Sequence, residues 1–303
     1  MRLCLTGGTG LIGQELYSVL EQDRHEIVAL TRSPEKARRK LPSAHCITWD
    51  ANSTLTSQPA LEGLDGVIHL AGEPIAAGRW TARRKANIRD SRVVGTRNLV
   101  ELLCQLQDPP RVLVSGSAIG YYGDRADERL EEDALPADDF LGQACREWED
   151  EAQQATKCGI RVVQLRTGLV LSTRGGVLPQ MLTPFKMFLG GPLASGQQWM
   201  SWIHIQDQVR AIQHVLFNQE CTGPVNLTAP SPVTNGEFTK VLASVLKRPS
   251  IFRVPKSILI LLLGELAETL LLRGQRVLPR KLQESGYEFK YPYLKEALLD
   301  LLN

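Results

Sequence analysis

The feature that most constrains this chain is a glycine-rich turn close to its N-terminus. Residues 2–6 have the apolar pattern of a short strand, residues 11–22 have that of an amphipathic helix, and Thr6-Gly7-Gly8-Thr9-Gly10 joins them. Glycine there allows a tight turn and lets the backbone approach a diphosphate, while the start of the helix supplies free N–H groups. The turn therefore predicts a dinucleotide-binding unit, with a plain tight turn as the alternative. The predicted binding residues are Gly7, Thr9, Gly10, Leu11, Ile12 and Gly13.

Strand-like and helix-like segments alternate up to about residue 170, which is typical of a parallel sheet with crossover helices. We predict strands at Arg2–Thr6, Glu26–Leu30, Cys46–Trp49, Gly66–Leu70, Arg111–Ser115 and Arg161–Leu165. We predict helices at Leu11–Gln22, Asn87–Leu106 and Gly142–Lys157. The expected fold class is α/β, a Rossmann doubly wound parallel sheet with a smaller C-terminal substrate domain.

Glycine and proline interrupt regular elements after residue 170, so a second region is expected there. Residues 1–170 would form the nucleotide-binding domain, and residues 203–226 would return to it, with Asp207 as the N-cap of a helix. Residues 171–202 and 227–303 would form the smaller domain. The stretch from Pro255 onward would either enter the core or cover the contact of a homodimer.

Charge and cysteine content exclude several classes of protein. Lys and Arg number 35 against 33 Asp and Glu, with no long run of one sign, so no nucleic-acid partner is expected. The six cysteines include no close pair, which predicts reduced thiols in the cytoplasm and no metal site. A glycine turn precedes any signal-peptide core, so secretion is not expected. The apolar run Ile258–Leu263 is far below the roughly 20 residues that span a bilayer, which favours a buried helix and no membrane partner.

The end of the second predicted strand indicates which nicotinamide cofactor the turn would take. NAD-binding folds place an Asp or Glu here for the ribose 2′-hydroxyl. This chain has Thr31, Arg32 and Ser33 instead, and a guanidinium is suited to a 2′-phosphate. The pattern favours NADP(H), unless Arg32 is only a solvated surface charge.

Several further segments resemble those of one enzyme family. With the glycine turn, they make the chain similar to extended short-chain dehydrogenase/reductases of the nucleotide-sugar epimerase type, in particular to the atypical "epimerase family protein" group with a small C-terminal domain of unknown function. The segments are His69–Gly72, Ser115–Gly123, Arg166–Leu171, Gly190–Pro192, Trp202–Ile205 and Gly274–Pro279.

The resemblance implies NADP(H) binding and a small-molecule substrate, sugar-like or related, and it assigns further cofactor contacts. Leu70, Ala71 and Gly72 would lie beside the adenosine, and Ser115 would lie beneath the nicotinamide. The segment containing Arg166, Gly168 and Val170 would flank the nicotinamide. Asn87 and Arg92 would either face the cofactor or lie on a solvated helix face.

The chain departs from this family at its usual proton-transfer pair, Tyr-x-x-x-Lys. The corresponding positions hold Leu141 and Cys145. The candidate substitutes are Ser117, Tyr121 and Tyr122, each with a turn or packing role as the alternative. A titrating His204 and a reactive Cys145 are less favoured than their structural readings.

Two functions remain open at this level. One is an NADP(H)-dependent oxidoreductase or epimerase-like enzyme with an unconventional proton donor. The other is a non-catalytic NADP(H)-binding sensor that regulates a partner. Arg79, Arg83, Arg84 and Lys186 are candidate anchors for an anionic substrate, and Trp80, Trp199 and Trp202 are candidates for stacking on a ring; solvated and packed roles are the alternatives.

Overall fold

A seven-stranded parallel sheet forms the centre of the protein. The computed structural model describes residues 1–51 and 59–303. The strand order is β11-β7-β5-β4-β1-β2-β3, and every neighbouring pair is parallel. The strands are β1 (Arg2–Thr6), β2 (Glu26–Thr31), β3 (His45–Thr48), β4 (Gly66–His69), β5 (Val112–Ala118), β7 (Arg161–Thr167) and β11 (Gly223–Leu227).

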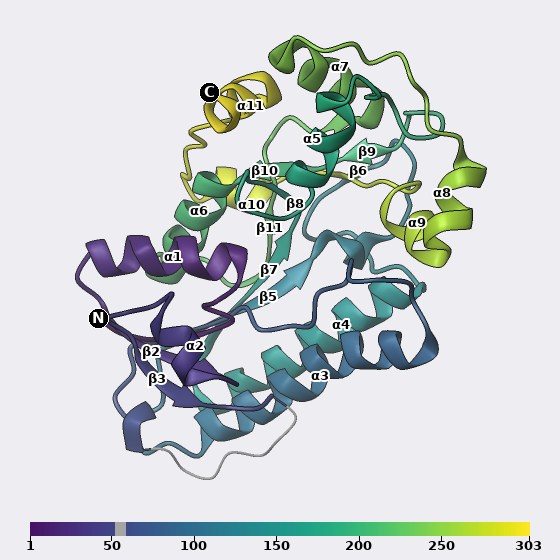
Figure 1. The fold of residues 1–303 in the computed structure, drawn as a ribbon. Coiled ribbons are helices and arrows are strands. Elements are labelled where there is room, and N and C mark those ends of the chain that lie inside the picture. The colour runs from purple at the N-terminus through teal and green to yellow at the C-terminus, as the bar shows by residue number, and fades with distance from the viewer. Residues whose placement is uncertain (52–58) are drawn as a thin grey trace.

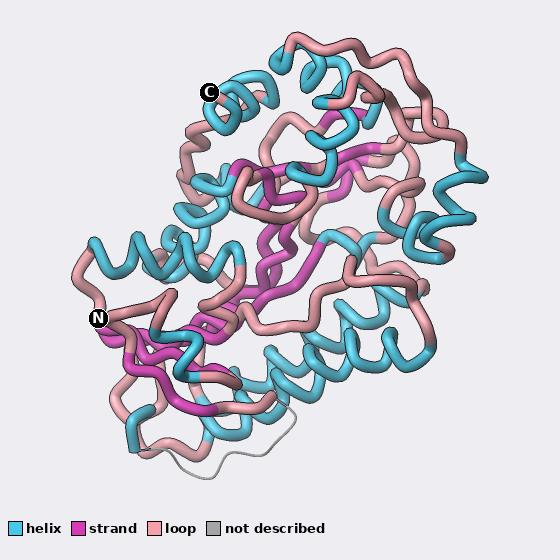
Figure 2. Tube along the Cα trace, viewed as in Figure 1, coloured by secondary structure: helices cyan, strands magenta, loops and turns pink. Residues whose placement is uncertain are grey.

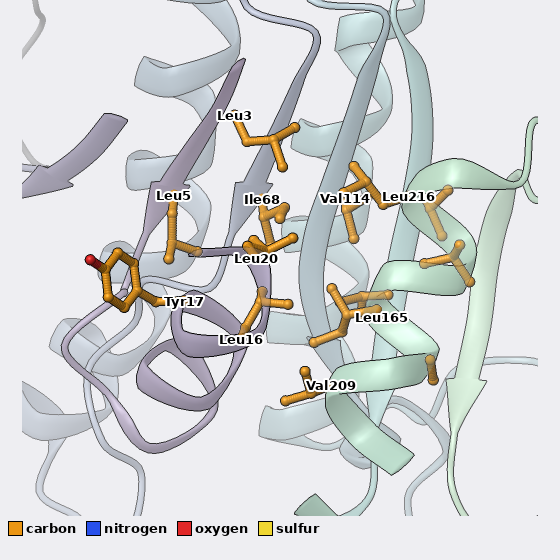
Figure 3. Packing of buried hydrophobic residues seen from close by; sticks show 14 of the residues in the cluster. Leu3, Leu5, Leu16, Tyr17, Leu20, Ile68, Val114, Leu165, Val209 and Leu216 are labelled. Atoms are coloured by element: carbon orange, nitrogen blue, oxygen red, sulfur yellow. The ribbon is translucent and has the colours of Figure 1, made fainter. Parts of the chain in front are cut away.

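Helices cover both faces of this sheet (Figure 1). Helices α1 (Leu11–Gln22), α2 (Pro34–Arg38) and α6 (Ile205–Phe217) lie on one face, and α3 (Ala82–Cys104) and α4 (Phe140–Gln153) lie on the other. Side chains alternate along β1, so Leu3 and Leu5 join one core while Cys4 joins the other. Figure 3 shows the first core, in which Leu16 and Leu20 of α1 pack on the sheet. The expected doubly wound α/β fold is confirmed.

The observed boundaries differ from the predicted ones mainly at helix starts. Helix α3 begins at Ala82 rather than Asn87, because the Thr81 side chain accepts a hydrogen bond from the Arg84 amide and caps the helix. Helix α6 is capped by His204, which accepts from the Gln206 amide, and not by Asp207 as predicted. Asp207 is buried and instead accepts bonds from the Tyr287 hydroxyl and the Lys290 and Tyr291 amides.

The C-terminal half adds a smaller layer of helices and paired short strands above the carboxyl end of the sheet (Figure 2). Its core includes Trp202, Phe238 and Leu298. The helices are α5 (Leu178–Lys186), α7 (Asn235–Leu246), α8 (Lys256–Leu263), α9 (Glu265–Leu270), α10 (Arg280–Glu284) and α11 (Leu294–Leu302). The strand pairs are β8 (Leu169–Leu171) with β10 (Trp202–His204), β9 (Trp199–Met200) with β12 (Val233–Thr234), and β6 (Arg129–Leu130) with β13 (Arg276–Val277).

Helix α8 is not the buried helix that its apolar sequence predicts. Of its residues only Leu259 is buried, while Leu261 is 74% exposed and Leu262 is 63% exposed. No helix within residues 1–51 and 59–303 is both long and apolar enough to cross a membrane.

The prediction that all cysteines are reduced is wrong for one pair. Cys104 at the end of α3 and Cys158 in the 3₁₀ turn η3 (Gln154–Cys158) form a disulfide across 54 residues of sequence. Parallel packing of α3 and α4 brings the two cysteines together, which their spacing does not reveal. The other four cysteines are buried free thiols.

Breaking this cross-link is expected to destabilise the fold. We predict that Cys104→Ser/Cys158→Ser lowers the free energy of unfolding by about 2–4 kcal/mol, because the unfolded chain regains the freedom that the closed loop removes. Urea unfolding with and without reductant measures this. The control is Cys221→Ser, which replaces a buried free thiol. Equal unfolding of oxidised and reduced wild type would contradict the prediction.

Candidate functional site

The glycine turn lies at the carboxyl end of β1, where two close approaches of the backbone exclude side chains. Gly7 has φ +69°, and a Cβ there would lie 2.6 Å from the Leu70 carbonyl. A Cβ on Gly13 would lie 2.3 Å from the Gly7 oxygen. Helix α1 begins at Leu11 after the N-cap Gly10, with no side-chain cap and no acidic residue in its first turn. Its first amides are therefore left for an external anion, which fits the diphosphate of a dinucleotide.

A chain of buried hydrogen bonds fixes this turn against β4. The Ala71 amide donates to Thr6 Oγ1 at 3.2 Å, and Thr6 Oγ1 lies 2.6 Å from His69 Nδ1. His69 Nε2 lies 3.0 Å from Thr96 Oγ1 of α3. The two threonine hydroxyls thus engage both ring nitrogens of His69, since each hydroxyl can donate or accept. A neutral His69 therefore holds the turn, the end of β4 and α3 together.

Acid is expected to release this arrangement. Burial lowers the pKa of His69 from 6.5 to about 4, so the unfolded chain binds a proton that the folded chain refuses. Stability from this group is present above pH 6.5 and is lost as pH falls toward 4, by about 3 kcal/mol. Urea unfolding at pH 7 and pH 4 measures this loss of unfolding free energy. We expect the loss to be smaller by that amount in His69→Gln than in wild type. An identical pH dependence would exclude His69 as the responsible group.

Two cations contact the glycine turn or helix α1, and a third follows β2. Arg32 follows β2 on the surface and forms no ion pair with any residue that the structure describes. The Lys40 ammonium donates to the Thr9 carbonyl at 3.2 Å, which places a second cation at the turn that sequence reasoning missed. Arg174 pairs with Glu15 of α1 and was also missed. Both residues lie in loops, and nothing in the sequence near either residue predicts that its loop packs against the glycine turn or α1.

A buried polar network lies at the carboxyl ends of β5 and β7. Arg166 donates to both oxygens of Glu149, each at 2.8 Å, and the Ser117 hydroxyl donates to Glu149 Oε1 at 2.6 Å. Arg166 also donates to the Tyr122 hydroxyl at 2.9 Å, and that hydroxyl donates to Asn226 at 2.7 Å. Every one of these residues is less than 9% exposed. Glu149 and Asn226 were not predicted as site residues, because only the tertiary contacts reveal their role.

This network changes the predicted catalytic set. The Tyr122 hydroxyl is fully buried between two protein partners, and burial raises its pKa to about 12, so the structure does not favour Tyr122 as a proton donor. The Arg166 guanidinium faces Glu149 rather than open space. Tyr121 is half-buried, with Arg166 3.5 Å from its ring centre. Burial also raises the pKa of Cys145 to about 12, so this thiol is not an activated nucleophile.

The remaining predicted cofactor residues lie around the same edge of the sheet. A Cβ on Gly72 would lie 3.3 Å from the Arg92 guanidinium, which is 5.2 Å from the Trp148 ring. That guanidinium donates a hydrogen bond to the Ile88 carbonyl of its own helix at 2.9 Å. Asn87 is exposed on α3. The predicted positions that complete the edge are Leu70 and Ala71 after β4, Ser115 in β5, and Gly168 and Val170 after β7.

Two of the arginine anchors predicted for an anionic substrate are already engaged by protein. Arg79 donates to the carbonyls of Leu261 and Leu262 at the end of α8. Arg84 pairs with Glu73 at 2.7 Å. Arg83 and Lys186 are exposed. A pocket of about 410 Å³ beside this segment contains no predicted cofactor residue; its lining includes Trp80, Lys85, Arg89, Phe140 and Glu265.

The other aromatic candidates are also structural. Trp202 is buried and donates to the Ser231 carbonyl, and Trp199 donates to Asp127. His204 is buried 3.2 Å from Asp300, and burial lowers its pKa. These contacts account for all three side chains without a ligand.

Comparison with known proteins agrees with the fold and the turn. Residues 3–227 match the NAD dependent epimerase/dehydratase family. The chain belongs to the NAD dependent epimerase/dehydratase family. Residues 254–301 match a C-terminal domain of unknown function, DUF1731.

Relatives of this family member cover nearly its whole length. The chloroplastic homologue of epimerase family protein SDR39U1 from Arabidopsis thaliana is 43% identical over 300 residues, 98% of this chain and 86% of that protein. A crystal structure of human epimerase family protein SDR39U1 with NADPH is similar at TM-score 0.88 and 32% identity, covering 99% of each chain. UDP-glucose 4-epimerase from Thermotoga maritima, crystallised with UDP-glucose, shares the fold at 18% identity and TM-score 0.80, over 99% of this chain and 97% of that one.

Proposed function

We propose that this chain is an NADP(H)-binding oxidoreductase or epimerase-like enzyme that acts on a hydroxyl-bearing small molecule, such as a nucleotide sugar. The observation that carries this proposal is the start of α1, which has no side-chain cap and lies at the carboxyl end of the sheet. The glycines at 7, 10 and 13 keep side chains away from it, so a diphosphate can approach the backbone amides there. The likeness to a human relative crystallised with NADPH supports the choice of cofactor.

The residues at the strand ends fit such a cofactor. Thr31, Arg32 and Ser33 would hold the 2′-phosphate, and the backbone of the glycine turn would hold the diphosphate. Leu70–Gly72 would border the adenosine, while Ser115 and the segment 166–170 would border the nicotinamide. When bound, the nicotinamide supplies or accepts a hydride.

Ser117 and Tyr121 would take complementary parts in proton handling. Glu149, paired with Arg166, accepts a hydrogen bond from the Ser117 hydroxyl. The lone pairs of the Ser117 oxygen would then accept a hydrogen bond from a substrate hydroxyl. The Tyr121 phenol is only half-buried, in contrast to the fully buried Tyr122 hydroxyl, and it carries its proton at neutral pH. Tyr121 would therefore donate the proton when a carbonyl is reduced.

Absorbance of the reduced nicotinamide tests the function directly. Purified protein carrying NADP⁺ or NADPH is mixed with nucleotide sugars and small hydroxy or keto compounds. A substrate-dependent change in absorbance is expected, and Tyr121→Phe should lower its rate about 10²–10⁴-fold without changing cofactor affinity. An unchanged absorbance across the panel, with proven cofactor occupancy, would count against the enzyme and favour the sensor. A sensor needs no proton-transfer pair, which agrees with Leu141 and Cys145 at those positions.

Arg32→Ala tests the choice between the two nicotinamide cofactors. We expect NADPH affinity to fall about 10–100-fold with little change for NADH, because only NADPH carries the phosphate that the guanidinium would bind. Fluorescence titration measures both constants. Arg111→Ala is the control, since Arg111 is exposed at the amino end of β5. Equal loss for both cofactors would remove Arg32 from the phosphate site.

A further inference from the structure

One surface of the C-terminal half combines exposed apolar side chains with cations. It consists of residues 186–193 at the end of α5 and residues 247–263, which include α8, and we call it the basic apolar surface. Most large hydrophobic side chains that are exposed in the described chain belong to it. They are Met187, Phe188, Leu189, Ile251, Phe252, Ile258, Leu261 and Leu262.

The two segments of this surface contact one another. The Phe252 amide donates to the Gly190 carbonyl at 3.3 Å, and the Val254 amide donates to the Pro192 carbonyl at 3.0 Å. The Arg248 guanidinium lies 4.5 Å from the centre of the Phe188 ring. Helix α8 begins at Lys256, two residues after Val254. Its exposed side chains therefore follow directly on the paired segment.

The charge of this surface has one sign. Neither 186–193 nor 247–263 contains Asp or Glu. The cations there are Lys186, Lys247, Arg248, Arg253 and Lys256, all exposed. Within the described part of the chain, no carboxylate forms an ion pair with any of them. The surface therefore combines exposed apolar groups with cations that pair with no described carboxylate, and the first acidic residues after it are Glu265 and Glu268 of α9.

Charge and composition together select the occupant. A two-fold dimer through this surface would set the same cations against each other, which is unfavourable. Aliphatic and Phe side chains beside Lys and Arg are what an anionic lipid interface takes up.

We propose that the basic apolar surface binds this protein peripherally to membranes that contain anionic lipids. Leu261, Leu262 and Phe252 would enter the headgroup boundary, and the cations would lie among the phosphates. This revises the sequence-based expectation of no membrane partner, which considered only a spanning segment. The proposal is independent of the catalytic one, because no proposed cofactor or proton-handling residue belongs to the surface.

Vesicle co-sedimentation of the full chain tests the proposal. Wild type should sediment with vesicles of mixed phosphatidylglycerol and phosphatidylcholine, but not with phosphatidylcholine alone, and less at high salt. Leu261→Glu should reduce the bound fraction about tenfold, because it places a carboxylate at an anionic interface. The control is Leu135→Glu, since Leu135 is likewise 74% exposed but lies outside the surface; it should bind like wild type.

A second variant and a second measurement separate the alternatives. Replacing Lys247, Arg248, Arg253 and Lys256 with Gln should abolish the preference for anionic vesicles while leaving NADPH affinity unchanged, which also reports folding. Wild type that stays in the supernatant with both vesicle types would overturn the proposal. A second result would also overturn it: wild type that binds no vesicles but self-associates in light scattering, with the self-association abolished by Leu261→Glu. The surface would then join copies of the chain.

Discussion

Gly13→Ala is expected to lower NADPH affinity roughly 100-fold or more, which corresponds to about 3 kcal/mol. The added Cβ would lie 2.3 Å from the Gly7 oxygen and 2.7 Å from the Gly8 Cα, both backbone atoms of the turn. Backbone cannot move aside as a flexible side chain does, so the turn must separate from α1 and displace the amides that face the diphosphate.

Fluorescence titration with NADPH measures this loss, and thermal unfolding measures the accompanying loss of stability. Gly175→Ala is the matched control, because its Cβ would meet only Leu11 at 3.5 Å, an ordinary contact. Wild-type affinity in Gly13→Ala would remove the glycine turn from the cofactor site, whatever the protein's activity.

Arg166→Met is expected to destabilise the fold by about 3–5 kcal/mol. It leaves the Glu149 carboxylate buried without its cation and removes one of the two partners of the Tyr122 hydroxyl. Because Glu149 also accepts from Ser117, the variant should disturb the proposed substrate position as well.

A double-mutant cycle separates the pair from its neighbours. Arg166→Met/Glu149→Leu should be more stable than Arg166→Met by about 1–3 kcal/mol, because no buried charge then remains unpaired. Arg97→Met breaks the exposed pair between Arg97 of α3 and Glu151 of α4 and should cost at most about 1 kcal/mol. A similar small cost for Arg166→Met in urea unfolding would show that the buried network is not structural.

The sequence alone determined the nucleotide-binding half of this protein. The predicted range of α1 equals the observed one, and the six predicted strands lie within three residues of the observed boundaries. This succeeded because the information is local: alternation of apolar residues sets the strands, and a glycine turn between a strand and a helix has few other uses. The NAD dependent epimerase/dehydratase family was recognisable from the same motifs.

Only the tertiary structure decided which polar side chains near β5 and β7 are already hydrogen-bonded within the protein and which can still react with a ligand. Ser117, Glu149 and Arg166 meet across 17 to 32 residues, and Tyr122 reaches Asn226 across 104, so no periodicity reveals that the Tyr122 hydroxyl is occupied. The same holds for the Cys104–Cys158 disulfide and for the exposure of α8. An apolar run predicts that a helix has an apolar face, but whether that face is covered depends on what the rest of the chain packs against it.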